Sequence, residues 1–333
     1  ASSLEPGFVD GRLLVNIDSE DEGYFTVGCA GGINTNLSLP LEFANVPADY
    51  QILKINAGGM KGGHSGIDIN KEKANAIKVL ARALALIKEK VDVRLANFAG
   101  GTAHNAIPRD ADAVVAVPAA EVAQVKTIVG QAMETMKTEF KNTDPDLFIK
   151  AELVDEVFDN VATADATDKF INFVIVIPHG VAAMSTDIES LVETSNNLAR
   201  VKIEDNTIKV LTSQRSSIVS RLDALTSRIE MVARLAGGEG KSGDGYPPWQ
   251  PNMDSPLLAK SLKIYEGLFN KKPVVEVIHA GLECGIIGDK NPGMDMISIG
   301  PTLKFPHSPD EKIHVGTIGM VWDFLAELLK ELK

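Results

Sequence analysis

Three stretches of the chain hold histidines and carboxylates in settings that suit metal or acid–base chemistry. The first, residues 305–315, reads FPHSPDEKIHV and holds His307 between two prolines. Neutral imidazole is the most common nitrogen ligand of zinc, and prolines restrict the backbone, so little ordering entropy is lost on binding. His307 is therefore a candidate metal ligand. A histidine in a proline-rich loop is, on its own, more often a surface residue, so this interpretation requires a further ligand elsewhere.

A second candidate ligand follows a short apolar run. Residues 12–17 read RLLVNI and predict a buried parallel strand, which ends just before Asp18. Ligands collect beyond the carboxyl ends of such strands, so a carboxylate placed there is suited to an active site. A solvated acidic turn is the alternative. The turn is favoured for Glu20, Asp21 and Glu22, whereas the two interpretations are balanced for Asp18.

The third stretch is rich in glycine. Residues 57–69 read AGGMKGGHSGIDI and surround Lys61, His64 and Ser65 with glycines. Glycine permits close backbone approach and positive φ, so this loop is suited to placing His64 against a ligand. A phosphate-binding loop is the competing interpretation, but the GxxxxGKS order is missing.

Composition excludes several classes of function. The 333 residues are 44% hydrophobic and 23% charged, as in ordinary globular proteins. The net charge of -12 and the pI near 5.0 argue against nucleic-acid and anionic-membrane partners, which require clustered Lys and Arg. Cys29 and Cys284 are too few for a disulfide framework, and the sequence shows neither an 18-residue apolar run nor a signal segment. A cytoplasmic protein is expected.

The elements that must position these residues fall into two groups. Strand-like segments up to residue 55, a strand at 91–98, a loop that leads into a strand within 100–117 and a strand at 146–154 alternate with helices at 71–90 and 121–141. Strand, helix, strand, strand, helix, strand is the order of a ferredoxin-like unit. An apolar run near 170–177, strands near 191–203 and 207–213, and a helix at 217–235 predict a second, looser α/β unit on the same sheet.

The C-terminal part predicts a different layer. Residues 237–245 read GGEGKSGDG and predict a linker. Helices at 256–269 and 316–333 alternate with strands at 274–279 and 296–300, and AGLECGIIG between them predicts a loop. This alternation predicts a parallel layer. The expected fold class is α/β, with one α/β layer interrupted by a long α+β insertion.

Six stretches, taken together and in this order, resemble the bacterial Xaa-His dipeptidases (aminoacyl-histidine dipeptidase, peptidase D). These belong to the dinuclear-zinc metallopeptidase superfamily that includes aminoacylase and carnosinase. The similarity runs from about Leu13 to the last helix, through NIDSEDEG with GCAGG, KGGHSGIDI, GGTAHNAIPR, YPPWQP, IHAGLECG and MISIGPTLKFPHSPDEKIHV. It implies a zinc-peptidase catalytic layer formed by residues 1–32 and 241–333. Residues 33–240 would form an inserted ferredoxin-like lid, doubled by its second unit.

The resemblance also implies roles for individual residues. Asp18 and His307 match ligands of two different zinc ions, with cobalt or manganese as alternative metals. His64 matches a lid histidine that approaches the scissile carbonyl, and is the expected catalytic residue.

Three further positions match substrate-binding residues of the family. Asn105 and Arg215 match lid residues that hold a small dipeptide, and the planar fork of Arg215 suits a C-terminal carboxylate. Gly281 matches a position whose backbone lines the substrate pocket. A homodimer is one option for assembly. The other is a monomer, in which the doubled lid replaces the lid–lid pairing of simpler relatives.

The family's His-x-Asp motif, bridging aspartate and Glu-Glu pair are not found. Because the chain opens in mid-pattern at Ala1, we expect an N-terminal portion to be lacking and the catalytic layer to be incomplete. Each zinc would then keep one protein ligand where catalytic sites usually have three. Two functions follow. One is zinc-dependent hydrolysis of Xaa-His dipeptides by a metal-activated water in the intact protein. The other is a catalytically inactive fragment that acts only as a structural or binding unit.

Overall fold

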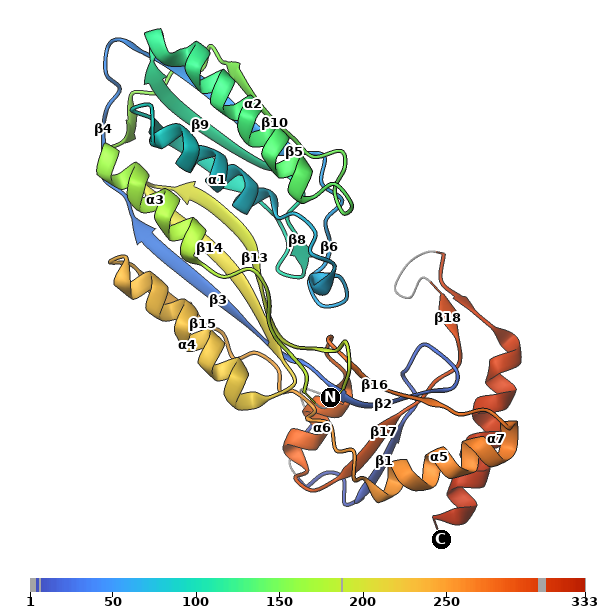
Figure 1. The fold of residues 1–333 in the computed structure, drawn as a ribbon. Coiled ribbons are helices and arrows are strands. Elements are labelled where there is room, and N and C mark those ends of the chain that lie inside the picture. The colour runs from blue at the N-terminus through green and yellow to red at the C-terminus, as the bar shows by residue number, and fades with distance from the viewer. Residues whose placement is uncertain (1–3, 6, 187, 305–309, 333) are drawn as a thin grey trace.

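The computed structural model describes residues 4–5, 7–186, 188–304 and 310–332, which form two bodies joined end to end (Figure 1). One is built on a nine-stranded sheet, here the large sheet, and the other on a four-stranded sheet, here the small sheet. The large sheet contains β3 (Gly31–Pro40), β5 (Tyr50–Gly58), β7 (Arg94–Gly100), β9 (Ala111–Pro118), β10 (Phe148–Leu153), β12 (Gly180–Met184), β13 (Val192–Glu204), β14 (Thr207–Ser216) and β15 (Glu239–Ser242). The small sheet contains β1 (Leu13–Asn16), β2 (Tyr24–Cys29), β16 (Val274–Ile278) and β17 (Asp295–Ser298).

Helices and short strands complete the two bodies. The helices are α1 (Ala76–Lys88), α2 (Val122–Glu139), α3 (Ala164–Val176), α4 (Val219–Leu235), α5 (Pro256–Phe269), α6 (Glu283–Lys290) and α7 (Val315–Glu331). Three short strand pairs lie outside the sheets, β4 (Phe43–Asn45) with β11 (Asn160–Ala162), β6 (Gly63–His64) with β8 (Ala106–Ile107), and β18 (Leu303–Lys304) with β19 (Lys312–Ile313).

The large sheet consists of two units with the same strand order. In the first unit the chain runs β5, α1, β7, β9, α2, β10, and the strands lie in the order β10-β5-β9-β7. In the second unit the chain runs β3, α3, β13, β14, α4, β15, and the strands lie in the order β15-β3-β14-β13. Each unit therefore places its fourth, first, third and second strands side by side, which is the ferredoxin-like arrangement. The α/β fold class and the doubled ferredoxin-like unit predicted from the sequence are confirmed.

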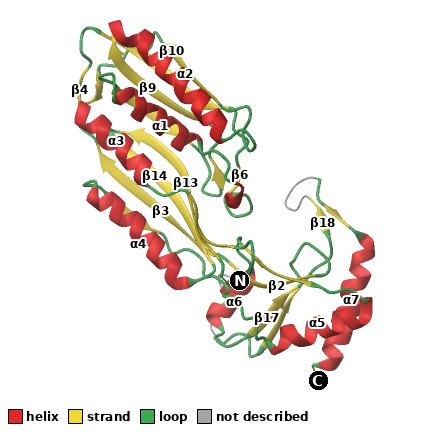
Figure 2. Cartoon of the chain, in the orientation of Figure 1, coloured by secondary structure: helices red, strands yellow, loops and turns green. Residues whose placement is uncertain are grey.

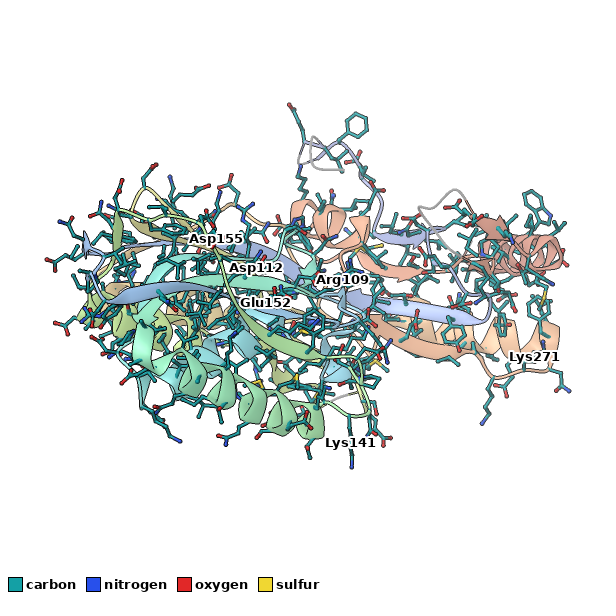
Figure 3. All side chains as sticks on the ribbon, turned by 90° about the horizontal axis from the view of Figure 1, so that it is seen from above. Arg109, Asp112, Lys141, Glu152, Asp155 and Lys271 are labelled. Carbon is teal, nitrogen blue, oxygen red and sulfur yellow. The ribbon has the colours of Figure 1, made fainter. Side chains whose placement is uncertain are left out.

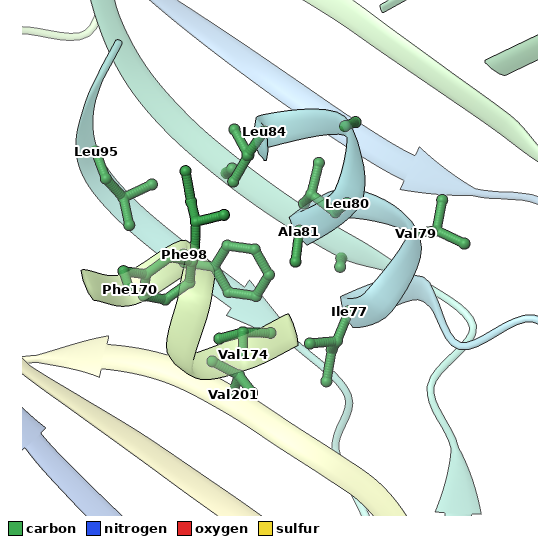
Figure 4. Packing of buried hydrophobic residues seen from close by; sticks show 14 of the residues in the cluster. Ile77, Val79, Leu80, Ala81, Leu84, Leu95, Phe98, Phe170, Val174 and Val201 are labelled. Carbon is green, nitrogen blue, oxygen red and sulfur yellow. The ribbon is translucent and has the colours of Figure 1, made fainter. Parts of the chain in front are cut away.

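The first unit is inserted into the second, between β3 and α3, and the two share a hydrophobic core. They meet where β7 pairs with β13, through Gly100 opposite Val201 and Ala99 opposite Lys202. Helices α1 to α4 form one layer on one face of the sheet (Figure 2). Figure 4 shows the packing at the seam, where Phe98 of β7 meets Phe170 of α3 with ring centroids 4.9 Å apart. Burial of these large apolar side chains stabilises the two units as one body.

The helix boundaries follow from capping residues. Asn75 precedes α1 and accepts hydrogen bonds from the backbone N–H groups of Ile77 and Lys78. Ser255 accepts from Leu258 at the start of α5, where Pro256 occupies the first helical position. Such side chains satisfy backbone donors that have no partner inside the helix. For this reason α1 begins at Ala76 and not at Lys71, where the amphipathic pattern alone placed it.

The face of the large sheet opposite the helices is charged. Asp112 and Glu152, labelled in Figure 3, project from β9 and β10, and Lys54 of β5 forms an ion pair of 3.3 Å with Asp112. Exposed pairs of this kind contribute little free energy. The main core lies on the helix-covered face, and a smaller apolar cluster that includes Val114 and Val161 is buried on the opposite face.

The small sheet is mixed, so the prediction of a parallel layer was wrong. β1 pairs with β17 and β16 with β2 in parallel, but β17 meets β2 antiparallel at Ser298 opposite Thr26. Helices α5 and α7 pack together beside it, and Phe25 of β2 lies edge-on to both Tyr265 and Phe324.

Two other element predictions need correction. The supposed linker 237–245 contains strand β15, which pairs with β3, and helix α6 begins within the supposed loop AGLECGIIG. The apolar run at 170–177 belongs to helix α3. The strands of the large sheet begin at Gly31 and end at Ser242. The division into residues 1–32, 33–240 and 241–333 stays a proposal.

Within the described residues, none of the helices combines the length and apolar character needed to cross a membrane.

Candidate active site

His64 lies on a short antiparallel strand pair, β6 with β8, at the end of the first unit that faces the small sheet (Figure 1). It stands opposite Ala106 in the β6–β8 pair, and the N–H of Ser65 donates to the carbonyl of Asn105 at 2.8 Å. Buried Asp144 accepts from the backbone N–H groups of Lys61 at 2.7 Å and Ala74 at 2.8 Å, which fixes both ends of the loop that carries His64. His64 and Asn105 are thus neighbours on one rigid support.

Hydrogen bonds define the protonation of the His64 ring. Its Nδ1 accepts from the backbone N–H of Gly66 at 3.2 Å and of Ile67 at 3.3 Å, so the proton of the neutral ring is on Nε2. Burial and the charge of Arg215 hold the pKa of His64 below its usual value, although Asp68 acts in the opposite direction. The ring is therefore neutral near pH 7, and it presents one N–H donor that is suited to an oxygen bearing developing negative charge.

Arg215 is a buried cation on β14, near the junction of the large-sheet body with the small-sheet body. Its side chain is only 6% exposed, and Nη1 donates to the hydroxyl of Tyr246 at 3.0 Å. Its buried Nε has no hydrogen-bond partner, and within the described part of the chain no carboxylate forms an ion pair with it. A buried cation without a counter-ion is costly, so the arrangement favours an anionic ligand.

Tyr246 is held in place by two glycines. It forms an antiparallel bridge with Gly32 of β3, and a Cβ atom on Gly32 would lie 2.7 Å from the Tyr246 side chain. A Cβ atom on Gly281 would lie 2.7 Å from the other edge of the same ring. Burial raises the pKa of Tyr246, so its hydroxyl keeps a proton. Gly281 therefore allows Tyr246 to approach and contact Arg215.

His279 links the small sheet to the large one. It follows β16, and its Nε2 lies 2.7 Å from the hydroxyl of Ser195 on β13. Burial, followed by the charge of Arg215, lowers the pKa of His279 to about 3. Its backbone carbonyl lies 2.5 Å from where a Cβ on Gly66 would be, so the His64 loop touches this strand end. Ser195 is itself buried and stands opposite Arg215 in the β13–β14 ladder.

A cavity of about 380 Å³ lies beside Arg215. It is lined by glycines 32, 243 and 245 and by six other residues, Asn34, His104, Ser213, Arg215, Asp244 and Tyr246. The lining comes from β3, β14, the loop after β15 and the loop before β8. Ligand pockets in proteins have volumes of this order.

The metal ligands inferred from the sequence are not brought together within the described residues. Asp18 is exposed just beyond the end of β1, and His307 lies outside the described residues. In the part of the chain that the structure describes, no group of three or more His, Cys, Asp or Glu side chains could hold a metal ion. The described donor set alone does not fit a catalytic zinc ion, which usually has three protein ligands.

Sequence reasoning thus found part of this arrangement. His64, Asn105 and Arg215 gather at one end of the large sheet, and Gly281 reaches them through Tyr246. Their roles stay predictions.

Other residues near the site were missed or misjudged. The conformational restriction of YPPWQP was a signal for Tyr246, but Asp244 stood in the supposed linker. His104 is exposed in the loop before β8, whereas His179 is half-buried. The Nδ1 of His179 contacts the side-chain amide of Asn75 at 3.3 Å.

The comparisons with known proteins agree with this arrangement. Residues 55–144 match the family model of the peptidase dimerisation domain. The cytosol non-specific dipeptidase of Escherichia coli (strain K12) is 41% identical over 334 residues, which take in 100% of this chain and 68% of that protein. This chain belongs to the M20 peptidase family. M20 peptidases hydrolyse peptide bonds and generally depend on a dinuclear metal centre.

A comparison with a solved structure supports the same family. The aminoacylhistidine dipeptidase of Vibrio alginolyticus superposes with a TM-score of 0.93 at 39% identity, over 98% of this chain and 67% of that chain. The chain thus spans about two thirds of the length of both relatives. The match to the Escherichia coli protein takes in the whole of this chain.

Proposed function

We propose that this M20 peptidase hydrolyses dipeptides of the Xaa-His type in the cytoplasm. The similarity to a cytosol dipeptidase and to an aminoacylhistidine dipeptidase supports the substrate class and the location. The observation that carries the proposal is that a neutral His64 and a buried Arg215, which has no ion-pair partner among the described residues, lie at the same end of the large sheet.

The two side chains act on different parts of the dipeptide. Arg215 binds the C-terminal carboxylate, whose charge compensates the buried guanidinium. His64 donates its Nε2 proton as a hydrogen bond to the carbonyl oxygen of the scissile bond. This bond strengthens as negative charge develops on the oxygen, so it lowers the barrier more than it tightens substrate binding. Asn105, in the loop just before β8, is the proposed third substrate contact.

The cofactor is part of the proposal and rests on family membership. We propose two zinc ions, with cobalt or manganese as alternatives, and Asp18 and His307 as one ligand each. A zinc ion supplies a Lewis acid and a bound water of lowered pKa.

Hydrolysis of Ala-His by the purified chain, measured together with its zinc content, tests the proposal. Turnover with bound zinc supports it. Zinc-loaded protein without turnover contradicts it and favours the second function, a catalytically inactive binding unit, which accords with the lack of a three-ligand group among the described residues.

Replacing His64 separates its catalytic role from a binding role. We expect His64→Ala to lower kcat by about 10²–10³-fold with little change in KM, because the bond it removes is strongest in the transition state. His64→Gln, which keeps a neutral N–H donor, should recover part of the loss. Steady-state kinetics on Ala-His checks both variants. An effect confined to KM would mean that His64 only binds substrate.

A homodimer is proposed from the match to the peptidase dimerisation domain. Light scattering coupled to size-exclusion chromatography would give a mass of one or two chains.

A further inference from the structure

The cavity beside Arg215 is lined by two residues of opposite charge that form no ion pair with each other. Arg215 is buried, and Asp244 is exposed in the loop after β15. Both line the same cavity of about 380 Å³, yet among the described ion pairs none joins them. A cavity of this kind complements a ligand that carries a carboxylate at one end and a cationic or N–H-donating group at the other.

We propose that this cavity is the subsite for the C-terminal residue of the dipeptide, and that Asp244 selects basic or imidazole side chains there. The proposal rests on the proposed function, in which Arg215 holds the carboxylate of that residue. The side chain of the same residue then enters the cavity next to Arg215. An ammonium, guanidinium or imidazole group at its end finds the Asp244 carboxylate as acceptor.

The other lining groups are compatible with this assignment. Asn34 and Ser213 offer neutral hydrogen-bonding groups, and the ring of Tyr246 forms an apolar wall. Besides Arg215 and Asp244, the charged or titratable residues on the wall are His104 and Tyr246. Asp244 is the only carboxylate among the described lining residues, so it is the one anionic acceptor for a basic side chain.

The orientation of Arg215 depends on the same wall. Its Nη1 donates to Tyr246, and Tyr246 is wedged between Gly32 and Gly281. The guanidinium is therefore fixed at one side of the cavity. A fixed carboxylate site gives the side chain of the bound residue a defined direction, which specificity requires.

Matched dipeptides test the role of Asp244. Ala-Lys and Ala-norleucine have side chains of similar length that differ in charge. We expect Asp244→Asn to lower kcat/KM for Ala-Lys by about two- to fivefold relative to Ala-norleucine, a modest effect because the carboxylate is exposed. Asp223→Asn on α4 removes the same charge from an exposed residue outside the cavity lining, and should leave the ratio unchanged.

Two outcomes would overturn the inference. An unchanged ratio in Asp244→Asn means that Asp244 does not select the side chain. An equal loss for both dipeptides means that Asp244 recognises a shared group, such as the N-terminal ammonium.

Failure of the proposed function is distinguishable, because the wild-type chain would then cleave neither dipeptide. The subsite is tested in that case by NMR titration with free lysine and free norleucine. Tighter binding of lysine that is lost in Asp244→Asn supports the subsite, and equal binding of the two amino acids contradicts it.

Discussion

The two units of the large sheet share a strand order but differ in what they bury. In the first unit the buried strand positions are apolar, as in Leu53, Ile55 and Val115. In the second unit, consecutive polar residues are buried at the start of β13 and at the end of β14, namely Thr194, Ser195, Asn196 and Asn197 on β13 and Thr212, Ser213, Gln214, Arg215 and Ser216 on β14. Burying polar groups is tolerated only where they are hydrogen-bonded. Both units therefore contribute to the main core, and only the second also supplies a buried polar framework, which surrounds Arg215 at one end of its strands.

The largest expected effect comes from a substitution that disrupts the core of the first unit and leaves the site residues unchanged. Phe98 is 1% exposed and packs on Phe170 across the seam. We expect Phe98→Ala to lower the free energy of unfolding by about 3–5 kcal/mol, because a cavity remains in place of the ring. Urea denaturation measures this, and kcat per folded molecule should not change. A Phe98→Ala variant that stays stable but loses activity would contradict the separation of core residues from site residues. Phe8→Ala is the control, since Phe8 is 78% exposed.

A smaller effect sharpens the comparison from the polar side. The side chain of Gln214 donates to Asn196 at 2.7 Å and to the hydroxyl of Thr212 at 2.6 Å, and it accepts from Thr35 at 2.7 Å. Gln214→Leu keeps the approximate volume but leaves these partners unsatisfied, so we expect a loss of about 1–3 kcal/mol.

Leu95→Met in the first unit is the matched control for Gln214→Leu. It changes shape without removing a hydrogen bond, and should cost less than about 1.5 kcal/mol. Differential scanning calorimetry of both variants gives the ranking. Equal losses of stability in the two variants would show that the hydrogen bonds of Gln214 contribute no more than ordinary apolar packing.

The smallest effect concerns the seam between the units and depends on pH. His179 accepts at Nδ1 from the N–H of Leu198 at 3.3 Å, and burial, together with the charge of Lys78, lowers its pKa to about 3. The unfolded chain therefore binds this proton at higher pH than the folded chain. The stabilisation is complete above about pH 6.5 and is lost as pH falls towards 3, by at most about 1.4 kcal/mol per pH unit.

Chemical denaturation at pH 6.5 and 5.5 measures that slope. His179→Gln retains an acceptor that does not titrate, so its stability should fall less over this interval. His279, whose pKa is lowered to about 3 as well, adds a parallel slope that the variant leaves in place. An unchanged slope in His179→Gln would place the pH sensitivity elsewhere.

The sequence predicted the elements with strong periodicity and the residues carried by glycine-rich loops. Helix α5 was expected at its observed bounds, and in the structure Ser255 caps its start at Pro256. Strand β15 was taken for a linker because an edge strand of Gly, Lys and Ser has no alternation to read. Helix α6 was missed because two of its eight residues are glycines, which disfavour helices.

The site was only partly predictable for a related reason. His64 and Arg215 lie on different units, and their proximity depends on how the units join. Tyr246 contacts Arg215 only because Gly32 and Gly281, distant in sequence, both lack a Cβ atom. A local sequence pattern does not show that residues so distant in the chain come into contact.

The insertion of the first unit into the second also sets an order of assembly. Thr35 and Gln214, which hydrogen-bond in the second unit, are 179 residues apart, whereas the first unit lies within one stretch from Tyr50 to Leu153. Contacts between distant residues form slowly because a long loop must close first. The pairing of Leu53 with Leu153 brings the ends of that stretch together, so a folded first unit shortens the loop that β3 and β14 must close. We therefore expect the framework of Arg215 to form last in the large sheet, so that slow folding of the first unit delays activity without altering any contact in the site.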